Sequence, residues 1–310
     1  MTPRRRRAIL IVLAACGAGA WIWCARPPGP TGAWMARAGV APRYLDAAGW
    51  RVRYVRTGSG PPLVLVHGFA SSIYTWSETL PALAAGHDVI ALDLPGFGGT
   101  DTRPTLTADD LARVVPAVTD GLGLGPYDLA GHSLGGAIAA VTAATRPQQV
   151  RRLILIDAAG FNLAAADRPA VLRVLGMVPP AVFELLPLAR PSTMLGLRQV
   201  FHDDRLVTRE RVDEYLAPMV RPGTAAALRS LLISRDGLDV PAQVARIRQP
   251  TLVIWGRDDR WIDVSHAARF VAAIPGARAE VLESCGHMPQ EERPADVVRL
   301  TLGFLSGAAR

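Results

Sequence analysis

The sequence contains no lysine, only three cysteines and no cluster of metal-ligating side chains. All 34 basic residues are arginine, which indicates a GC-rich genome and carries no functional information. Cys16 and Cys24 lie in an apolar N-terminal run, so Cys285 is left without a partner for a disulfide framework. No histidines and cysteines recur at metal-ligand spacing, and no phosphate-binding glycine loop follows the first expected strand. We therefore predict no metal site and no cofactor.

Most of the net positive charge lies at the N-terminus. The formal net charge is +7, but five arginines lie among the first 30 residues, which contain no acidic residue. The rest of the chain carries only +2, so neither a basic face nor a nucleic-acid partner is predicted. Half of the 310 residues are hydrophobic, which excludes a disordered chain and provides the core of one large domain.

The N-terminus has the pattern of a membrane anchor. Four arginines at 4–7 precede the uncharged residues 8–25, a length near the minimum for a helix that spans a bilayer. Two tryptophans lie where the far membrane interface would be, and the arginines indicate the cytoplasmic end. We predict a single-pass anchor over residues 1–26, a proline-rich linker over 27–39 and a catalytic domain on the extracytoplasmic side.

Two other fates of this segment fit the sequence. Residues 13–16 resemble a bacterial lipobox, in which Cys16 would carry lipid after cleavage, although the chain stays apolar beyond this cysteine. The arginine run also resembles a twin-arginine export signal, which would give a secreted protein. We prefer the uncleaved anchor because its apolar run is longer than the apolar region of an ordinary signal peptide.

Beyond residue 40, short apolar runs alternate with helical stretches, which predicts an α/β fold with a mostly parallel sheet and helices on both faces. Residues 50–58 resemble an antiparallel edge strand. Residues 161–245 contain no convincing strand and several prolines, so we expect a helical cap inserted into a domain of residues 40–310. The other expected strands are 63–67, 88–93, 127–131, 152–157, 251–256 and 279–283, and the expected helices are 73–85, 108–120, 134–145, 264–273 and 294–306.

The segment 129–140, LAGHSLGGAIAA, places Ser133 in the motif G-x-S-x-G between an expected strand and an expected helix. A serine on such a tight turn needs very small neighbours, which Gly131 and Gly135 provide. The N-terminus of the helix that follows would stabilise a developing negative charge. Ser133 is therefore the predicted nucleophile.

Residues 67–72, HGFASS, directly follow another expected strand. A hydrolase needs two N–H donors directed at the oxygen that becomes negative. We predict that these are the backbone N–H groups of Leu134, next to the nucleophile, and of Phe69 in this loop. His67 is interpreted as a residue that stabilises the loop by hydrogen bonds and not as a general base.

A serine nucleophile requires a general base and an acid that orients the base. Among six histidines, His287 lies in a glycine-flanked loop after the last expected strand, from which it can reach over the strand ends. His132 adjoins Ser133, but adjacent side chains in a tight turn point apart. His287 is therefore the predicted base.

The stretch 255–263, WGRDDRWID, offers three aspartates as the acid. Side chains alternate in direction at the end of a strand, so Asp258 and Asp259 cannot both face His287. Asp263 stands just before a helical stretch and is better explained as a helix N-cap. Local reasoning alone leaves the other two aspartates open.

These motifs together resemble the α/β-hydrolase superfamily, in the group with a helical cap between the sixth and seventh strands. The resemblance covers residues 45–308 and rests on HGFASS, DLPGFGGTD, GHSLGG, WGRDD and CGHMPQEE, in that order. It implies a cofactor-free serine hydrolase whose site lies beneath the cap. Family hydrolases carry the acid third after a glycine, which from Gly256 gives Asp259. Some relatives supply it from the preceding strand, so Asp157 is the reserve acid.

The nucleophile limits the chemistry that this resemblance implies. Haloalkane dehalogenases and epoxide hydrolases have an aspartate where Ser133 stands, whereas a serine favours acyl transfer. We predict hydrolysis of a small or medium-sized, apolar carboxylic ester. Hydrolysis of the C–C bond of ring-cleavage products and cofactor-free perhydrolysis share the same motifs and remain alternatives. A non-catalytic binding protein of this fold would be expected to lack a member of the triad, and none is missing.

Overall fold

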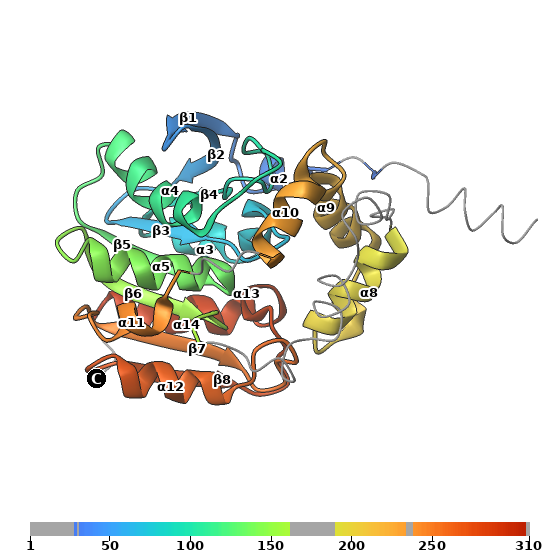
Figure 1. Ribbon diagram of the computed structural model, residues 1–310. Coiled ribbons are helices and arrows are strands. Elements are labelled where there is room, and N and C mark those ends of the chain that lie inside the picture. Colours follow the sequence, from blue (N-terminus) through green and yellow to red (C-terminus); the bar gives the residue numbers. More distant parts are fainter. Residues whose placement is uncertain (1–27, 30, 162–189, 234–237, 308–310) are drawn as a thin grey trace, which may run out of the picture.

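Hydrophobic strands form one eight-stranded sheet in the computed structural model, which describes residues 28–29, 31–161, 190–233 and 238–307. Helices lie on both faces of this sheet (Figure 1), which confirms the predicted α/β fold. The strands are β1 (Arg43–Ala47), β2 (Trp50–Thr57), β3 (Pro62–Val66), β4 (Asp88–Leu92), β5 (Tyr127–His132), β6 (Val150–Ile156), β7 (Thr251–Gly256) and β8 (Arg278–Leu282).

The strand order is β1-β2-β4-β3-β5-β6-β7-β8. β2 is antiparallel to both of its neighbours, and all other neighbouring strands are parallel. The carboxyl ends of parallel strands meet at one edge of a sheet, where ligands bind in folds of this class. The loops that follow β3, β5, β6 and β7 therefore lie together at that edge.

The prediction that residues 50–58 form an edge strand is wrong, because β1 pairs along the outer side of β2. Ala48 and Gly49 join the two strands with positive φ angles of 51° and 79°. Positive φ at both positions of a two-residue turn matches the twist of a hairpin. Asparagine, aspartate or glycine is usual at the first position, so the alanine concealed this turn in the sequence.

Each face of the sheet is covered by an apolar cluster. Val64 and Leu65, neighbours in β3, are 0% and 1% exposed and belong to opposite clusters. One cluster joins the sheet to α4 (Ala108–Gly121), α5 (Leu134–Thr145), α11 (Val240–Val244) and α12 (Ser265–Ala273). The other joins it to α2 (Ala33–Arg37), the 3-10 helix η1 (Ile73–Trp76), α3 (Leu80–Ala84) and α14 (Pro294–Leu305), which the short α13 (Pro289–Glu292) precedes.

The single helix expected over residues 73–85 is divided in the structure into η1 and α3. The hydroxyl of Ser72 accepts the N–H of Tyr74 and caps η1. Pro81 lies in the first turn of α3 and has no N–H for the bond that a continuous helix would make. The proline therefore starts a new helix.

The described part of the segment between β6 and β7 is helical. It contains α8 (Arg190–Val200), the 3-10 helix η2 (Asp204–Leu206), α9 (Arg209–Met219) and α10 (Thr224–Ile233), before α11 packs against α5. In Figure 1, α8, α9 and α10 lie together beside one end of the sheet. Residues 162–189 and 234–237 of the expected cap lie outside the described residues.

Candidate active site

Ser133 lies between β5 and α5 in a strained backbone conformation. Its φ is 51° and its ψ is −119°, a region that residues with a side chain rarely occupy. A Cβ on Gly135 would lie 2.3 Å from the carbonyl oxygen of Val66, and a Cβ on Gly131 would lie 2.2 Å from that of Gly135. The two glycines therefore provide the space that the G-x-S-x-G motif predicts.

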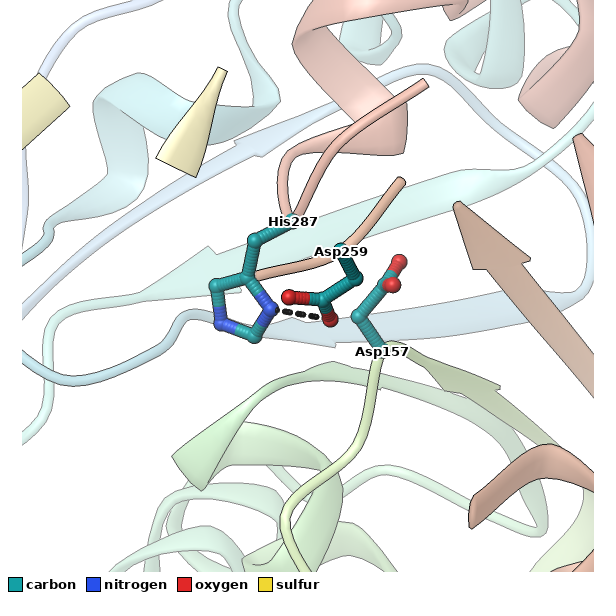
Figure 2. Close-up of side chains that lie close together, drawn as sticks. All are labelled: Asp157, Asp259 and His287. Atoms are coloured by element: carbon teal, nitrogen blue, oxygen red, sulfur yellow. Dashed lines mark hydrogen bonds and ion pairs between the residues drawn. The ribbon is translucent and has the colours of Figure 1, made fainter. Parts of the chain in front are cut away.

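Ser133, His287 and Asp259 form a continuous chain of hydrogen bonds. The Oγ atom of Ser133 lies 3.0 Å from Nε2 of His287. Nδ1 of His287 lies 2.7 Å from Oδ2 of Asp259, the contact drawn in Figure 2. The structure thus brings together three residues that are far apart in the sequence and were predicted to act as nucleophile, base and acid.

The surroundings of Asp259 keep its carboxyl ionised. Burial favours the neutral form, but the charge and hydrogen bond of His287 outweigh it and lower the pKa of Asp259. Its Oδ1 also accepts the N–H groups of Trp261 at 2.7 Å and Ile262 at 3.0 Å. An ionised Asp259 fixes the proton of His287 on Nδ1 and leaves Nε2 free to accept the proton of Ser133.

The other two aspartates of this stretch point elsewhere. Oδ2 of Asp258 lies 3.0 Å from Nδ1 of His202, at the surface. Oδ1 of Asp263 accepts the N–H of Ser265 at 2.9 Å, where α12 begins. Of the three candidates, only Asp259 reaches His287.

The loop that carries His287 is tied to the segment after α8. The N–H of His287 donates to the carbonyl oxygen of Val200 at 2.7 Å. One carboxylate oxygen of Glu292 accepts the N–H of Gly286 at 2.8 Å, and the other accepts that of His202 at 2.7 Å. Burial raises the pKa of Glu292, although these N–H groups oppose it. This role of Glu292 was not predicted; the motif CGHMPQEE indicated the loop but not its support.

Two further rings that were not predicted flank His287. The ring of Trp261 stacks on it with 5.8 Å between centroids and 24° between planes. Nε2 of His132 lies 2.7 Å from the carbonyl oxygen of His287. Burial, and next the nearby His287, lower the pKa of His132 to about 3, so its ring is neutral and Nε2 donates its hydrogen to that carbonyl. His132 therefore holds the backbone of His287.

Of the two residues predicted to form the oxyanion hole, Leu134 directly follows Ser133, and Phe69 directly follows Gly68, which approaches Ser133. Leu134 is the first residue of α5, where a backbone N–H has no acceptor within its own helix. Phe69 follows β3 in a loop that touches the nucleophile, since a Cβ on Gly68 would lie 2.9 Å from Cβ of Ser133. The role of these two N–H groups as the oxyanion hole stays a prediction.

His67 is completely buried, and its hydrogen bonds join its own loop to the segment after β4. Nδ1 lies 2.7 Å from the carbonyl oxygen of Gly68, and Nε2 accepts the N–H of Leu94 at 3.0 Å. Burial lowers the pKa of His67, so the ring is neutral. This geometry agrees with a loop-stabilising role.

Asp157, the reserve acid, directly follows β6 and is completely buried. Its Oδ1 accepts the N–H of Gly256 at 3.1 Å, and Figure 2 shows Asp259 between Asp157 and His287. Burial first, and then the charge of Asp259, raise the pKa of Asp157 well above its usual value. His287 is hydrogen-bonded to Asp259 and not to Asp157, so Asp157 has a different place in the cluster.

Asp157, Asp259 and His287 are also, within the described ranges, the one group of side chains close enough to share a cation, with ligand atoms within 4.8 Å of one another. Both ring nitrogens of His287 already have partners, namely Asp259 and Ser133. Hydrogen bonds therefore account for the cluster, and we assign no metal to it.

A buried polar cluster links α13 to α9. Oε1 of Glu291 accepts the hydroxyls of Thr75, at 2.7 Å, and of Tyr215. Nε of Arg211 lies 3.0 Å from the other carboxylate oxygen. Burial raises the pKa of Glu291 to about 7, although Arg211 and the two hydroxyls lower it. Nothing in the sequence predicted this cluster.

The predicted anchor, residues 8–25, and the lipobox cysteine Cys16 lie outside the described residues. None of the helices in the described part of the chain has the length and apolar character needed to cross a bilayer.

Known proteins resemble the chain over most of its length. A family model of the alpha/beta hydrolase fold matches residues 61–294. The chain is 35% identical over 275 residues to the dihydrolipoyllysine-residue acetyltransferase component of the acetoin cleaving system of Pseudomonas putida, covering 86% of this chain and 70% of the relative. It is 30% identical over 268 residues to the 2-hydroxy-6-oxo-6-phenylhexa-2,4-dienoate hydrolase of Burkholderia cepacia, covering 83% and 92%. A crystal structure of a membrane phospholipase A has a TM-score of 0.76 at 26% identity and covers 98% of both chains.

Proposed function

We propose that this chain, which belongs to the α/β-hydrolase family, is a serine hydrolase that cleaves carboxylic esters through an acyl-enzyme. The observation that carries the proposal is the chain of hydrogen bonds from Ser133 through His287 to Asp259. These three side chains come from three different loops, and each is buried. A nucleophile, a base and an orienting acid at these distances are what acyl transfer requires.

The mechanism follows from the positions of the protons. His287 takes the proton of Ser133 at Nε2 while Oγ attacks the carbonyl carbon of the ester, and ionised Asp259 stabilises the imidazolium. The backbone N–H groups of Phe69 and Leu134 stabilise the oxyanion. His287 then returns the proton to the leaving alcohol, and later activates the water that hydrolyses the acyl-enzyme.

A fluorophosphonate probe, which phosphonylates an activated serine, tests the assignment of the nucleophile. We expect the probe to label the wild-type protein and to leave Ser133→Ala unlabelled, because Oγ of Ser133 is hydrogen-bonded to the general base. Equal labelling of the two proteins would contradict the proposal. A folded protein whose Ser133 is labelled but which turns over no ester would instead favour a binding role.

Hydrolysis of a C–C bond is the second candidate, because the relative from Burkholderia cepacia is named as a dienoate hydrolase. Both reactions use the same serine, histidine and aspartate, and the substrate is set by side chains that line the site. Turnover of p-nitrophenyl esters of varied chain length should be measured beside turnover of a ring-cleavage dienoate. We expect the esters to be cleaved faster, and a preference for the dienoate would reverse the assignment.

We further propose that residues 8–25 anchor the enzyme in the membrane, with the catalytic domain on the extracytoplasmic side and residues 161–245 as a cap over the site. The resemblance to a membrane phospholipase A along 98% of both chains supports a membrane location and an ester substrate. The full-length protein should sediment with membranes and be released by detergent. Recovery of uncleaved protein in the soluble fraction would contradict the anchor.

A further inference from the structure

We propose that Asp157 is a positioning residue that retains its proton and donates a hydrogen bond to the ionised carboxylate of Asp259. This inference rests on the proposed function, because it concerns the acid of the same triad. It assigns Asp157 a role different from that of a reserve acid: Asp157 never contacts the histidine and keeps its proton throughout the reaction.

The backbone around Asp157 joins the nucleophile to β7. The N–H of Ser133 donates to the carbonyl oxygen of Ile156 at 3.0 Å, and the carbonyl oxygen of Ser133 accepts the N–H of Ala159 at 2.9 Å. Between these two contacts, Asp157 donates its own N–H to Ile254 at 3.0 Å and adopts a φ of 41°. A side-chain-bearing residue keeps a positive φ only where its surroundings impose it. Asp157 is therefore fixed relative to both Ser133 and the strand that leads to the acid.

The buried carboxyl groups of Asp157 and Asp259 have oxygen atoms within 4.8 Å of each other. Two such groups cannot both ionise without strong repulsion, so the pair shares one proton. Asp259 is stabilised as the anion by two backbone N–H groups and by His287. The carboxyl of Asp157 receives one N–H, from Gly256. His287 lies within 4.8 Å, but its Nδ1 is hydrogen-bonded to Asp259 and not to Asp157. The remaining titratable groups around Asp157 are Cys285 and Glu292, from the loop and helix after β8, and neither brings a positive charge. The proton therefore stays on Asp157.

The second oxygen of Asp157 indicates what this proton does. Oδ2 is buried and accepts no hydrogen from any N–H or O–H group among the described residues. A buried acceptor without a hydrogen-bond donor lowers stability, whereas a protonated oxygen can donate a hydrogen bond to a neighbour. Asp259 is that neighbour, and it lies between Asp157 and His287 (Figure 2). The hydrogen bond holds the acid from the side opposite the histidine.

Three variants distinguish a hydrogen-bond donor at Asp157 from a catalytic acid at Asp157. Asp157→Asn keeps the volume, and its amide can donate to Asp259 while its carbonyl accepts the N–H of Gly256, so we expect kcat and KM close to wild type. Asp157→Leu removes both bonds and should lower kcat about 100-fold with KM little changed, because the acid loses its fixed position. Asp259→Asn should lower kcat by about 10⁴-fold, since it favours the wrong tautomer of His287.

The melting temperature supplies a readout that does not depend on turnover. If native Asp157 is neutral, wild-type protein loses stability as the pH rises above about 4, because its unfolded chain then releases this proton and its native state does not. Asp157→Asn has no such proton, so its Tm relative to wild type should rise with pH. This measurement remains available if Asp157→Leu fails to fold.

Two results would overturn the proposal. The first is a Tm of Asp157→Asn that stays constant or falls relative to wild type as the pH rises above about 4, which means that native Asp157 is ionised there. The second is a loss of kcat in Asp157→Asn as large as that in Asp157→Leu, and if Asp259→Asn then keeps its turnover, Asp157 is the acid. A wild-type protein that is neither labelled nor active would contradict the proposed function instead, and the comparison of Tm values would still decide the state of Asp157.

Discussion

Gly135, two residues after Ser133, lies where the backbone leaves no room for a side chain. A Cβ at this position would lie 2.3 Å from the carbonyl oxygen of Val66 and 2.4 Å from that of His67. Both are backbone atoms at the end of a buried strand, so neither can move away cheaply. Gly125, by contrast, would place a Cβ in open space.

We therefore predict that Gly135→Ala lowers the free energy of unfolding by about 3 kcal/mol or more and prevents fluorophosphonate labelling of Ser133. Gly125→Ala is the matched control, and it should leave stability unchanged or raise it by about 0.5 kcal/mol. Urea titration measures both changes. Equal free energies of unfolding for the two variants would mean that the turn at Ser133 can accommodate the extra methyl group without loss of stability.

Among the elements of the fold, the short helix α13 determines where His287 lies. Glu292 at its end receives N–H groups from the histidine loop and from the segment after α8, and these two segments contact each other directly through Val200. The position of the base is thus coupled to helices of the expected cap. The coupling uses both oxygens of one carboxylate.

Glu292→Gln should break this link while preserving its shape. Glutamine has one acceptor oxygen, so either Gly286 or His202 would direct its N–H at an NH₂ group, at a cost of about 1–3 kcal/mol in stability. We expect kcat to fall more than KM rises. Glu283→Gln serves as the control, because its ion pair with Arg257 is exposed and contributes little to stability. Equal kinetics in the two variants would exclude a role for Glu292 in placing the base.

At the scale of the whole molecule, the features that could be predicted from the sequence are local or carried by motifs. The strand at 251–256 and the helix at 134–145 match the prediction to the residue, because each is an unbroken apolar or small-residue run. The motifs indicated the elements that carry Ser133, His287 and Asp259, and the resemblance selected among the aspartates.

Features that depend on distant contacts could not be predicted. Thr75 and Tyr215 lie 216 and 76 positions from Glu291 in the sequence, and they meet it only when η1 and α9 are both placed beside α13. The hydrogen bond between His132 and the backbone of His287 spans 155 positions. No periodicity or motif records such pairs, because they follow from the relative placement of elements that are already folded.

Glu291 should make the stability of the whole protein depend on pH. Its pKa is about 7 in the folded protein and lower in the unfolded chain, so the native state holds a proton that the unfolded chain has released. The stability that this proton contributes is complete below about pH 4.5 and is lost as the pH rises through about 7, with a maximum of about 3 kcal/mol. The raised pKa of Asp157 likewise makes stability fall as the pH rises.

We expect the Tm of the wild-type protein to fall between about pH 5 and about pH 7.5, and to fall less in Glu291→Gln, whose neutral amide keeps the volume and can accept the hydroxyls of Thr75 and Tyr215. Glu283→Gln should keep the full decline, because Arg257 lowers the pKa of that exposed carboxyl. Arg211 opposes this outcome, since its Nε lies 3.0 Å from the carboxylate and favours the ionised form. Scanning calorimetry between about pH 5 and about pH 7.5 distinguishes a neutral from an ionised Glu291. If the Tm values of wild type and Glu291→Gln fall in parallel, Arg211 keeps Glu291 charged in the native protein.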